Sequence, residues 1–210
     1  FGERNDVIDK KTLSIWERKG RIGFIGLGNM GSAIAMRLTK PKIDGLPLMV
    51  YDPDSIKLAP FIEKGAIAAK SSLELCKSCD IIFACLPTSA VTETVLFGDA
   101  GISSDLKPGQ IFVDMTSGDP AISRDQAARL AKAGVIFVDA PVSGGPRGAR
   151  EGTIAIMVGG EDKLYEQILP TLKGISSNIF HAGPVGAGHA LKAGNNLLNP
   201  VSYTHLTLPT

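Results

Sequence analysis

The sequence predicts an α/β protein with a doubly wound, mostly parallel sheet. From Arg21 onward, apolar runs of strand length alternate with amphipathic segments or segments punctuated by glycine and proline. This is the pattern of strand–helix units that build a parallel sheet. Several runs are apolar at every position, as expected where helices cover both faces of a sheet. A chain of 210 residues, 44% of them hydrophobic, is long enough to bury such a core.

The expected elements follow one another at short intervals, joined by right-handed crossovers. Strands are expected at residues 21–26, 47–52, 66–69, 80–86, 110–115, 135–140, 153–158 and 178–182. Helices are expected near 29–39, 54–64, 71–78, 88–97, 119–133 and 161–173. Residues 21–184 should therefore form one domain, preceded by an extension at 1–20 and followed by the start of a further helix at 185–200.

The turn after the first expected strand carries the first functional signal. In RIGFIGLGNMGSAIAMRL, three glycines have the spacing GxGxxG between an apolar strand and an Ala-rich helix. Such glycines permit a tight turn, let the backbone approach a pyrophosphate, and let helix and strand pack closely. The positive end of the helix then faces the phosphates. We therefore expect a Rossmann-type dinucleotide site whose turn consists of Gly26, Leu27, Gly28, Asn29, Met30 and Gly31.

An acidic residue at the end of the second expected strand bears on the choice of cofactor. Asp52 can accept hydrogen bonds from the adenosine ribose hydroxyls and would repel a 2′-phosphate. This favours NAD, although Asp54 could be the ribose partner instead and Lys57 could reach a phosphate, which leaves NADP possible. The alternative is that Asp52 only opens the next helix as part of an Asp-Pro-Asp turn.

Two later segments narrow the chemistry. In FVDAPVSGGPRGAREG, the Ser143 hydroxyl and the N–H groups of Gly144 and Gly145 can converge on a small anion such as a substrate carboxylate; the alternative is an ordinary glycine-rich connection. In GAGHALKAGNN, Lys192 and Asn196 are four residues apart and so share one face of a helix. A lysine there can exchange a proton with an alcohol or alkoxide during hydride transfer, while a neutral amide orients the substrate oxygen. A lone lysine is otherwise a solvated surface residue.

The composition limits the partners. The net charge of +1 gives no broad field that would gather nucleic acid, and no apolar run is long enough to span a membrane. Cys76 and Cys79 form a CxxC without a second ligand pair, so no metal site is expected and both should pack as small apolar groups, although a redox pair remains the alternative. A soluble protein of a reducing compartment, the cytoplasm or the mitochondrial matrix, is expected.

Six motifs taken together resemble one family, the β-hydroxyacid dehydrogenases related to 3-hydroxyisobutyrate dehydrogenase and tartronate semialdehyde reductase. The motifs are GFIGLGNMG, CLPTS, VDMTS, DAPVSGG, GTIAIMVGG and GAGHALKAGNN, and the resemblance covers about residues 21–199. The resemblance implies NAD(P)-dependent interconversion of a small 3-hydroxy acid and its semialdehyde. It implies that Lys192 is catalytic, that Asn196 and the Ser143–Gly145 loop bind substrate, and that Leu86, Pro87 and Ser117 contact the cofactor.

The resemblance also implies an all-helical domain after the Lys192 helix, and a homo-oligomer when that domain is present. The last ten residues, VSYTHLTLPT, can be translated from a transposase-type sequencing adaptor, so we expect residues 201–210 not to be native, and the chain to be a fragment, inactive by itself. The competing interpretation of the tail is a true strand. We also expect an exposed apolar face formed by Leu191, Leu197 and Leu198.

Two other functions are compatible with parts of this pattern. The chain as it stands could be only a nucleotide-binding module. The related 6-phosphogluconate dehydrogenase reaction is disfavoured, because a phosphorylated sugar calls for a basic cluster that is not found near the Ser143 loop.

Overall fold

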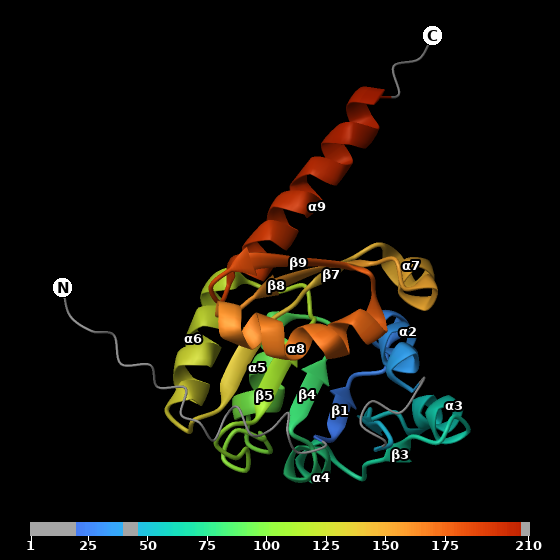
Figure 1. Ribbon diagram of the computed structural model, residues 1–210, viewed down its shortest axis with the longest axis vertical. Coiled ribbons are helices and arrows are strands. Elements are labelled where there is room, and N and C mark those ends of the chain that lie inside the picture. The colour runs from blue at the N-terminus through green and yellow to red at the C-terminus, as the bar shows by residue number, and fades with distance from the viewer. Residues whose placement is uncertain (1–19, 40–45, 207–210) are drawn as a thin grey trace, which may run out of the picture.

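The computed structural model describes residues 20–39 and 46–206, with side chains described up to residue 197. Within these residues, nine strands form one sheet that is covered by helices on both faces (Figure 1). The strands are β1 (Ile22–Ile25), β2 (Met49–Tyr51), β3 (Ile67–Ala68), β4 (Ile81–Ala84), β5 (Ile111–Asp114), β6 (Ile136–Asp139), β7 (Val142–Ser143), β8 (Ala155–Gly159) and β9 (Asn178–Gly183). The helices are α2 (Asn29–Leu38), the 3₁₀ helix η2 (Ser55–Leu58), α3 (Ala59–Ile62), α4 (Ser72–Ser78), α5 (Ser89–Phe97), α6 (Pro120–Ala131), α7 (Gly145–Glu151), α8 (Asp162–Ile175) and α9 (Ala187–Leu206).

The strand order confirms the predicted doubly wound fold. Strands β3, β2, β1, β4, β5 and β6 lie side by side in this order and are all parallel. The order reverses between β1 and β4, and in such sheets the crevice at the reversal is the usual ligand site. Beyond β6 the direction changes: β8 is antiparallel to β6 and β7 and parallel to β9.

Side chains of alternating strand positions fill two separate cores. On one face, Phe24 of β1 stacks on Phe83 of β4, with ring centroids 6.2 Å apart, beneath α2, α7 and α8. On the other face, Phe112 of β5 stacks on Phe137 of β6 at 5.9 Å, beneath α4, α5 and α6. Because both faces are buried, the strands are apolar at nearly every position, as the sequence predicted.

Polar side chains set where several helices begin. The hydroxyl of Ser71 accepts from the Glu74 N–H at the start of α4, and that of Thr88 accepts from the Val91 N–H at the start of α5. Asp119 accepts from the Ala121 N–H and precedes Pro120 at the first position of α6. These side chains satisfy N–H groups that have no partner within the helix.

The structure differs from the predicted elements in two places. The helix expected at 54–64 is a short 3₁₀ turn followed by the four residues of α3. The segment expected to be a loop after Ser143 contains the helix α7, which begins at Gly145, and the short strand β7 precedes it. The expected extension 1–20 lies almost entirely outside the described residues.

Helix α9 begins where it was expected and continues as a helix to Leu206, so the segment 201–206 is not the strand considered as an alternative. Figure 1 shows α9 rising away from the domain, so that only its first turns pack on the sheet. Leu191 and Leu197 are exposed, as predicted. The Leu198 side chain and residues 207–210 lie outside the described part of the structure.

A buried carboxylate fixes the start of α9. Asp139, the last residue of β6, is fully buried; its Oδ1 accepts from the Gly186 N–H at 2.7 Å and its Oδ2 accepts from the His189 N–H at 2.8 Å. Asp139 therefore acts as an N-terminal cap supplied by a distant strand, and its negative charge lies at the positive end of the helix dipole.

The side chain of His189 attaches the same turn of α9 to two further elements. His189 is fully buried, its Nε2 donates to the Thr116 carbonyl at 2.7 Å, and its Nδ1 lies 2.6 Å from the Ser123 hydroxyl of α6. The first turn of α9 is thus held by polar contacts to β6, α6 and the segment after β5.

Replacing Asp139 with Ala should lower the free energy of unfolding by about 2–4 kcal/mol, because two buried N–H groups lose their acceptor. Urea unfolding followed by circular dichroism measures this. Asp125→Ala, the same change at a position whose side chain is 64% exposed, is the control and should be nearly neutral. Equal stability of the two variants would contradict the proposed cap.

Candidate functional site

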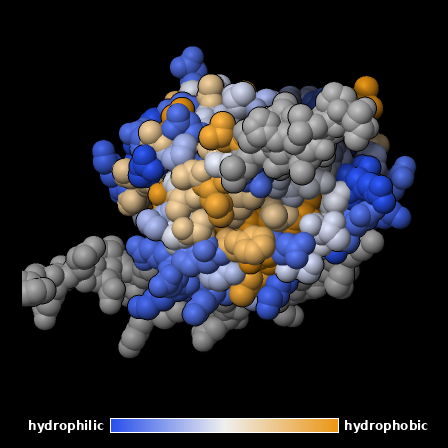
Figure 2. Space-filling view, turned by 90° about the horizontal axis from the view of Figure 1, so that it is seen from above, coloured by the Kyte–Doolittle hydropathy of each residue, from blue (hydrophilic) through white to orange (hydrophobic). Residues whose placement is uncertain are grey.

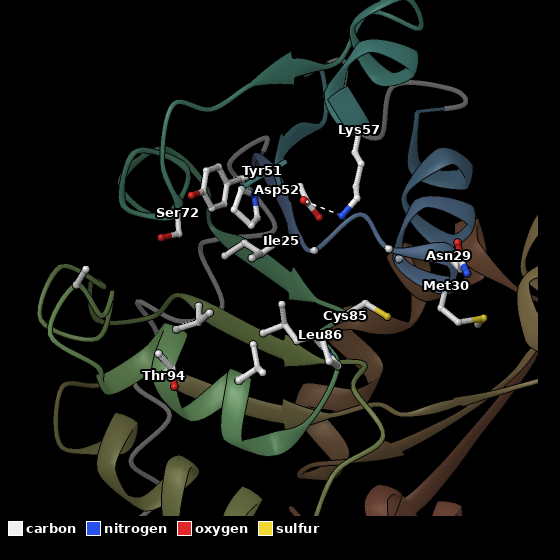
Figure 3. A pocket seen from close by; sticks show the side chains of 18 of the residues that line it. Ile25, Asn29, Met30, Tyr51, Asp52, Lys57, Ser72, Cys85, Leu86 and Thr94 are labelled. Carbon is white, nitrogen blue, oxygen red and sulfur yellow. Dashed lines mark hydrogen bonds and ion pairs between the residues drawn. The ribbon is translucent and has the colours of Figure 1, made fainter. Parts of the chain in front are cut away.

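A cavity of about 610 Å³ lies at the carboxyl ends of β1, β2 and β4, at the reversal of the strand order. Viewed onto this edge of the sheet, the molecule shows a band of hydrophobic surface bordered by hydrophilic residues (Figure 2). In close view, Tyr51 and Ile25 from one side and Leu86 from the other project toward the same space (Figure 3). Of the predicted cofactor residues, the cavity is lined by Gly26, Gly28, Asn29, Met30, Gly31, Asp52, Leu86 and Pro87.

The three glycines of the turn occupy distinct environments. Gly26 has φ of +91°, a conformation that strains any residue with a Cβ. A Cβ on Gly31 would strike the carbonyl oxygen of Gly26, so this glycine allows α2 to pack against the turn. Gly28 has an ordinary extended conformation, with φ −66° and ψ −172°, and a Cβ there would meet no atom within 4 Å. Its missing side chain leaves open space in the cavity and satisfies no packing requirement.

Asp52 holds the turn and also faces the cavity. Its Oδ2 accepts from the Leu27 N–H at 2.7 Å, and its Oδ1 accepts from the Asp54 N–H at 2.9 Å and from Lys57 Nζ at 3.1 Å. Burial alone raises the pKa of Asp52, but these N–H donors and Lys57 outweigh it and hold the pKa below its usual range. Leu27 is itself buried in the core, and its N–H points at Asp52.

Both interpretations of Asp52 therefore describe part of its environment. The Asp-Pro-Asp turn exists, since Asp54 caps η2. A carboxylate has about four acceptor positions, and three of those of Asp52 are occupied. One remains for a ligand. Lys57, whose side chain is 41% exposed, lies at the border of the cavity beside Asp52 (Figure 3).

A threonine hydroxyl fixes the backbone at the end of β4. Thr116 is buried, and its Oγ1 accepts from the Leu86 N–H at 3.0 Å. Its neighbour Ser117, the predicted cofactor contact, is exposed and lines a second cavity. The two adjacent hydroxyls thus have separate roles: one orients Leu86, and the other faces solvent.

The second cavity, of about 330 Å³, shares a wall with the first. Met30, Cys85, Leu86 and Pro87 line both. The second cavity brings together residues from widely separated motifs that were predicted as site residues: Leu86, Pro87, Ser117, Ser143, Gly144, Gly145 and Lys192.

The loop between β7 and α7 has a conformation that requires its glycines. Gly144 and Gly145 have φ of +125° and +67°, respectively, values that side chains with a Cβ seldom adopt. A Cβ on Gly144 would also come within 3.2 Å of Ile154. The loop is therefore built to hold a specific backbone shape next to Ser143.

Lys192 lies in the second turn of α9, three residues after the buried His189. It is the single charged residue among those described that line the second cavity. Burial lowers its pKa from the ordinary lysine value. A lysine with a lowered pKa has a larger neutral fraction at a given pH, and the neutral amine can accept a proton.

The structure places Asn196 outside both cavities and shows a contact of its neighbour Asn195 that was missed. Asn196 is exposed and is not among the residues that line either cavity. Its neighbour Asn195 donates from Nδ2 to the Ser143 Oγ at 3.1 Å. Residues three apart also share a helix face, so the spacing of Lys192 and Asn195 was a signal as good as the one used for Asn196.

The CxxC cysteines pack as predicted. Cys76 and Cys79 are buried in the second core, and burial raises the pKa of each thiol to about 12. Such thiols are poor nucleophiles and poor metal ligands at neutral pH.

Among the helices that the structure describes, none has the length and apolar character needed to cross a membrane.

Comparisons with known proteins agree with this geometry. Residues 21–183 match the family model of the NAD binding domain of 6-phosphogluconate dehydrogenase. The chain is 41% identical over 182 residues to 2-(hydroxymethyl)glutarate dehydrogenase of Eubacterium barkeri, covering 87% of this chain and 60% of the relative. It is 39% identical over 186 residues to mitochondrial 3-hydroxyisobutyrate dehydrogenase of Mus musculus, covering 88% of this chain and 54% of the relative.

The fold is similar to that of a solved structure, 3-hydroxyisobutyrate dehydrogenase of Mycobacterium tuberculosis with L-serine. The TM-score is 0.80 at 30% identity, and the match covers 87% of this chain and 61% of that one. The chain thus spans somewhat more than half the length of these relatives. Because the family model covers most of the chain and the relatives named above are hydroxyacid dehydrogenases, the chain belongs to the β-hydroxyacid dehydrogenase family.

Proposed function

We propose that the protein is an NAD(P)-dependent oxidoreductase that interconverts a small 3-hydroxy acid and its semialdehyde. The observation that carries the proposal is the common wall of the two cavities: one contains the nucleotide turn, and the other contains Lys192 and the Ser143 loop. A nicotinamide held against Leu86 and Pro87 would lie at the boundary, within reach of a substrate in the second cavity.

The first cavity supports dinucleotide binding. Space over Gly28 lets a pyrophosphate approach the backbone at the N-terminus of α2, where N–H groups and the helix dipole favour an anion. When bound, the nicotinamide cofactor supplies hydride transfer. The protein contributes the shape of the cavity and the groups that orient the ribose.

Asp52 and Lys57 bear on the preference between NAD and NADP. Asp52 is held in its charged form and has one free acceptor position, which suits a ribose hydroxyl and opposes a 2′-phosphate. Lys57 already neutralises part of this charge and could turn to a phosphate. We propose NAD as the preferred cofactor, with NADP binding more weakly.

The second cavity supports a substrate whose carboxylate is attached to the carbon adjacent to its reacting carbon. The Ser143 hydroxyl and the backbone of Gly144 and Gly145 would bind the carboxylate, while Lys192 takes the hydroxyl proton during oxidation and returns it during reduction. Asn196, one turn beyond Lys192, would orient the substrate oxygen if the substrate or another segment covers this exposed face.

The relatives support this class of substrate. 2-(Hydroxymethyl)glutarate and 3-hydroxyisobutyrate both carry a hydroxymethyl group on the carbon that bears the carboxylate, and L-serine does too. A phosphorylated sugar acid, as in the 6-phosphogluconate dehydrogenase reaction, fits less well because Lys192 is the single cation among the described residues lining the second cavity. A nucleotide-binding module without catalysis would bind cofactor but oxidise no hydroxy acid.

The setting of the protein is also a proposal. The free thiols of Cys76, Cys79 and Cys85 suit a reducing compartment, either the cytoplasm or the mitochondrial matrix. The exposed Leu191 and Leu197 suit further contacts along α9, as in a homo-oligomer of the whole protein.

Two glycine variants test the cofactor site. Gly28→Ala should leave the stability nearly unchanged but weaken NADH binding at least about tenfold, because its methyl group enters only the cavity. Gly31→Ala should lower the stability itself, since its methyl group meets the Gly26 carbonyl. Fluorescence titration with NADH and thermal unfolding separate the two effects. Unchanged NADH affinity in Gly28→Ala would place the pyrophosphate elsewhere.

The cofactor preference is tested by titrating the protein with NADH and NADPH. We expect NADH to bind more tightly, because the Asp52 carboxylate repels a 2′-phosphate. Lys57→Ala should weaken NADPH binding further while changing NADH binding little. Lys173→Ala, the same change at an exposed lysine of α8, is the control and should alter the binding of neither cofactor. Tighter binding of NADPH would reverse the assignment.

The role of Lys192 is tested in this chain expressed together with any further residues that its gene encodes. Lys192→Ala should abolish turnover of 3-hydroxyisobutyrate and keep NADH binding. In the unsubstituted protein, kcat/KM for oxidation should rise tenfold per pH unit and level off below the ordinary lysine pKa, because the base must be neutral and burial lowers its pKa. Turnover that survives Lys192→Ala would refute the assignment.

A further inference from the structure

A hydrogen bond joins the catalytic helix to the proposed carboxylate loop. Asn195 lies three residues after Lys192, on the same face of α9, and is half-buried. Its Nδ2 donates to the Oγ of Ser143, the last residue of β7, over 3.1 Å.

The direction of this hydrogen bond determines what Ser143 can offer a ligand. A serine hydroxyl has one hydrogen to donate and two lone pairs that accept. Because Asn195 donates to Oγ, one lone pair is used and the hydrogen remains free. If an acceptor stood at position 195, the hydrogen would be drawn to it, and Ser143 would present only lone pairs to the cavity.

The second cavity makes this direction important. Lys192 is the single charged group among its described lining residues, and as the base in oxidation it is neutral when the hydroxy acid is bound. The carboxylate then depends on neutral donors. Of the three lining hydroxyls, that of Thr116 is buried and lies against the Leu86 N–H and the Thr92 hydroxyl. Ser117 is exposed, so Ser143 is the hydroxyl placed beside the glycine loop.

We propose that Asn195 is a positioning residue that holds the Ser143 hydroxyl as a hydrogen-bond donor to the substrate carboxylate. This inference rests on the proposed function, because it assumes a carboxylate substrate at Ser143. It makes Asn195 a further residue that determines the specificity of that site. The pair Asn195–Ser143 favours a ligand group that accepts a hydrogen bond from Ser143, such as a carboxylate, over a group that donates one.

The test uses this chain together with any further residues that its gene encodes, loaded with NADH. The probe is isobutyrate, a carboxylate that has no hydroxyl group and therefore cannot be oxidised at the expected carbon. Binding is followed through the fluorescence of bound NADH. Asn195→Asp should weaken the binding of isobutyrate at least about thirtyfold, because the introduced carboxylate accepts the hydrogen bond of the Ser143 hydroxyl and adds negative charge. Asn195→Ala should weaken it about three- to tenfold, since the hydroxyl loses its orientation but keeps its hydrogen.

Two controls separate positioning from a general effect. Ala193→Asp places the same charge on an exposed position of α9, two residues away, and should change isobutyrate binding little. In a Ser143→Ala background, Asn195→Ala should have no further effect, because it acts through the hydroxyl. NADH affinity and the unfolding midpoint should be unchanged in every Asn195 variant.

Isobutyrate binding that is equal in Asn195→Asp and the unsubstituted protein would overturn the inference, as would losses from Ser143→Ala and Asn195→Ala that simply add. Absence of isobutyrate binding in the unsubstituted protein would overturn it too. Turnover of 3-hydroxyisobutyrate is measured separately: if isobutyrate binding depends on Asn195 but no hydroxy acid is oxidised, the inference stands and the proposed reaction fails.

Discussion

The contact of the buried Asp139 carboxylate with the start of α9 is the interaction on which the proposed site depends. A charge taken out of water is costly unless donors surround it, and here the Gly186 and His189 N–H groups are those donors. The contact joins the end of the parallel sheet to the helix that carries Lys192. The position of β6 is set by sheet hydrogen bonds and core packing. Through this contact it also fixes the position of Lys192, more than fifty residues later in the sequence.

The division of the site into two cavities follows from the sheet. The reversal between β1 and β4 opens the first cavity, and the change of direction after β6 brings β7 and its glycine loop to the border of the second. The common wall of Met30, Cys85, Leu86 and Pro87 comes from the α2 start and the β4 end, the two segments that flank the reversal. The same four residues therefore border both cavities.

The sequence predicted most of the parallel sheet, the Gly26–Gly31 turn and the place of Lys192, because each depends on a local pattern: an apolar run, a glycine spacing, or a helix after a glycine-rich segment. It did not predict α7, since GPRGARE has two glycines and a proline, and its helix is stabilised by packing against α2. Nor did it separate Asn195 from Asn196, because the rotation of α9 relative to β7 is decided by tertiary contacts such as those of His189. Asp52 shows the same limit: its spacing indicated a ribose contact, but its donors Leu27 and Lys57 appear only in the fold.

The clamped start of α9 also gives the helix a pivot. His189 lies about 5 Å along the helix axis from Lys192, whereas the exposed Leu197 lies about 12 Å away. If the helix tilts by about 10° around the clamp, the Leu197 backbone swings by about 2 Å while the Lys192 backbone moves by only about 1 Å. A body that docks along the outer turns of α9 can therefore rock while Lys192 keeps its place beside the cavity, because displacement grows with distance from the clamp.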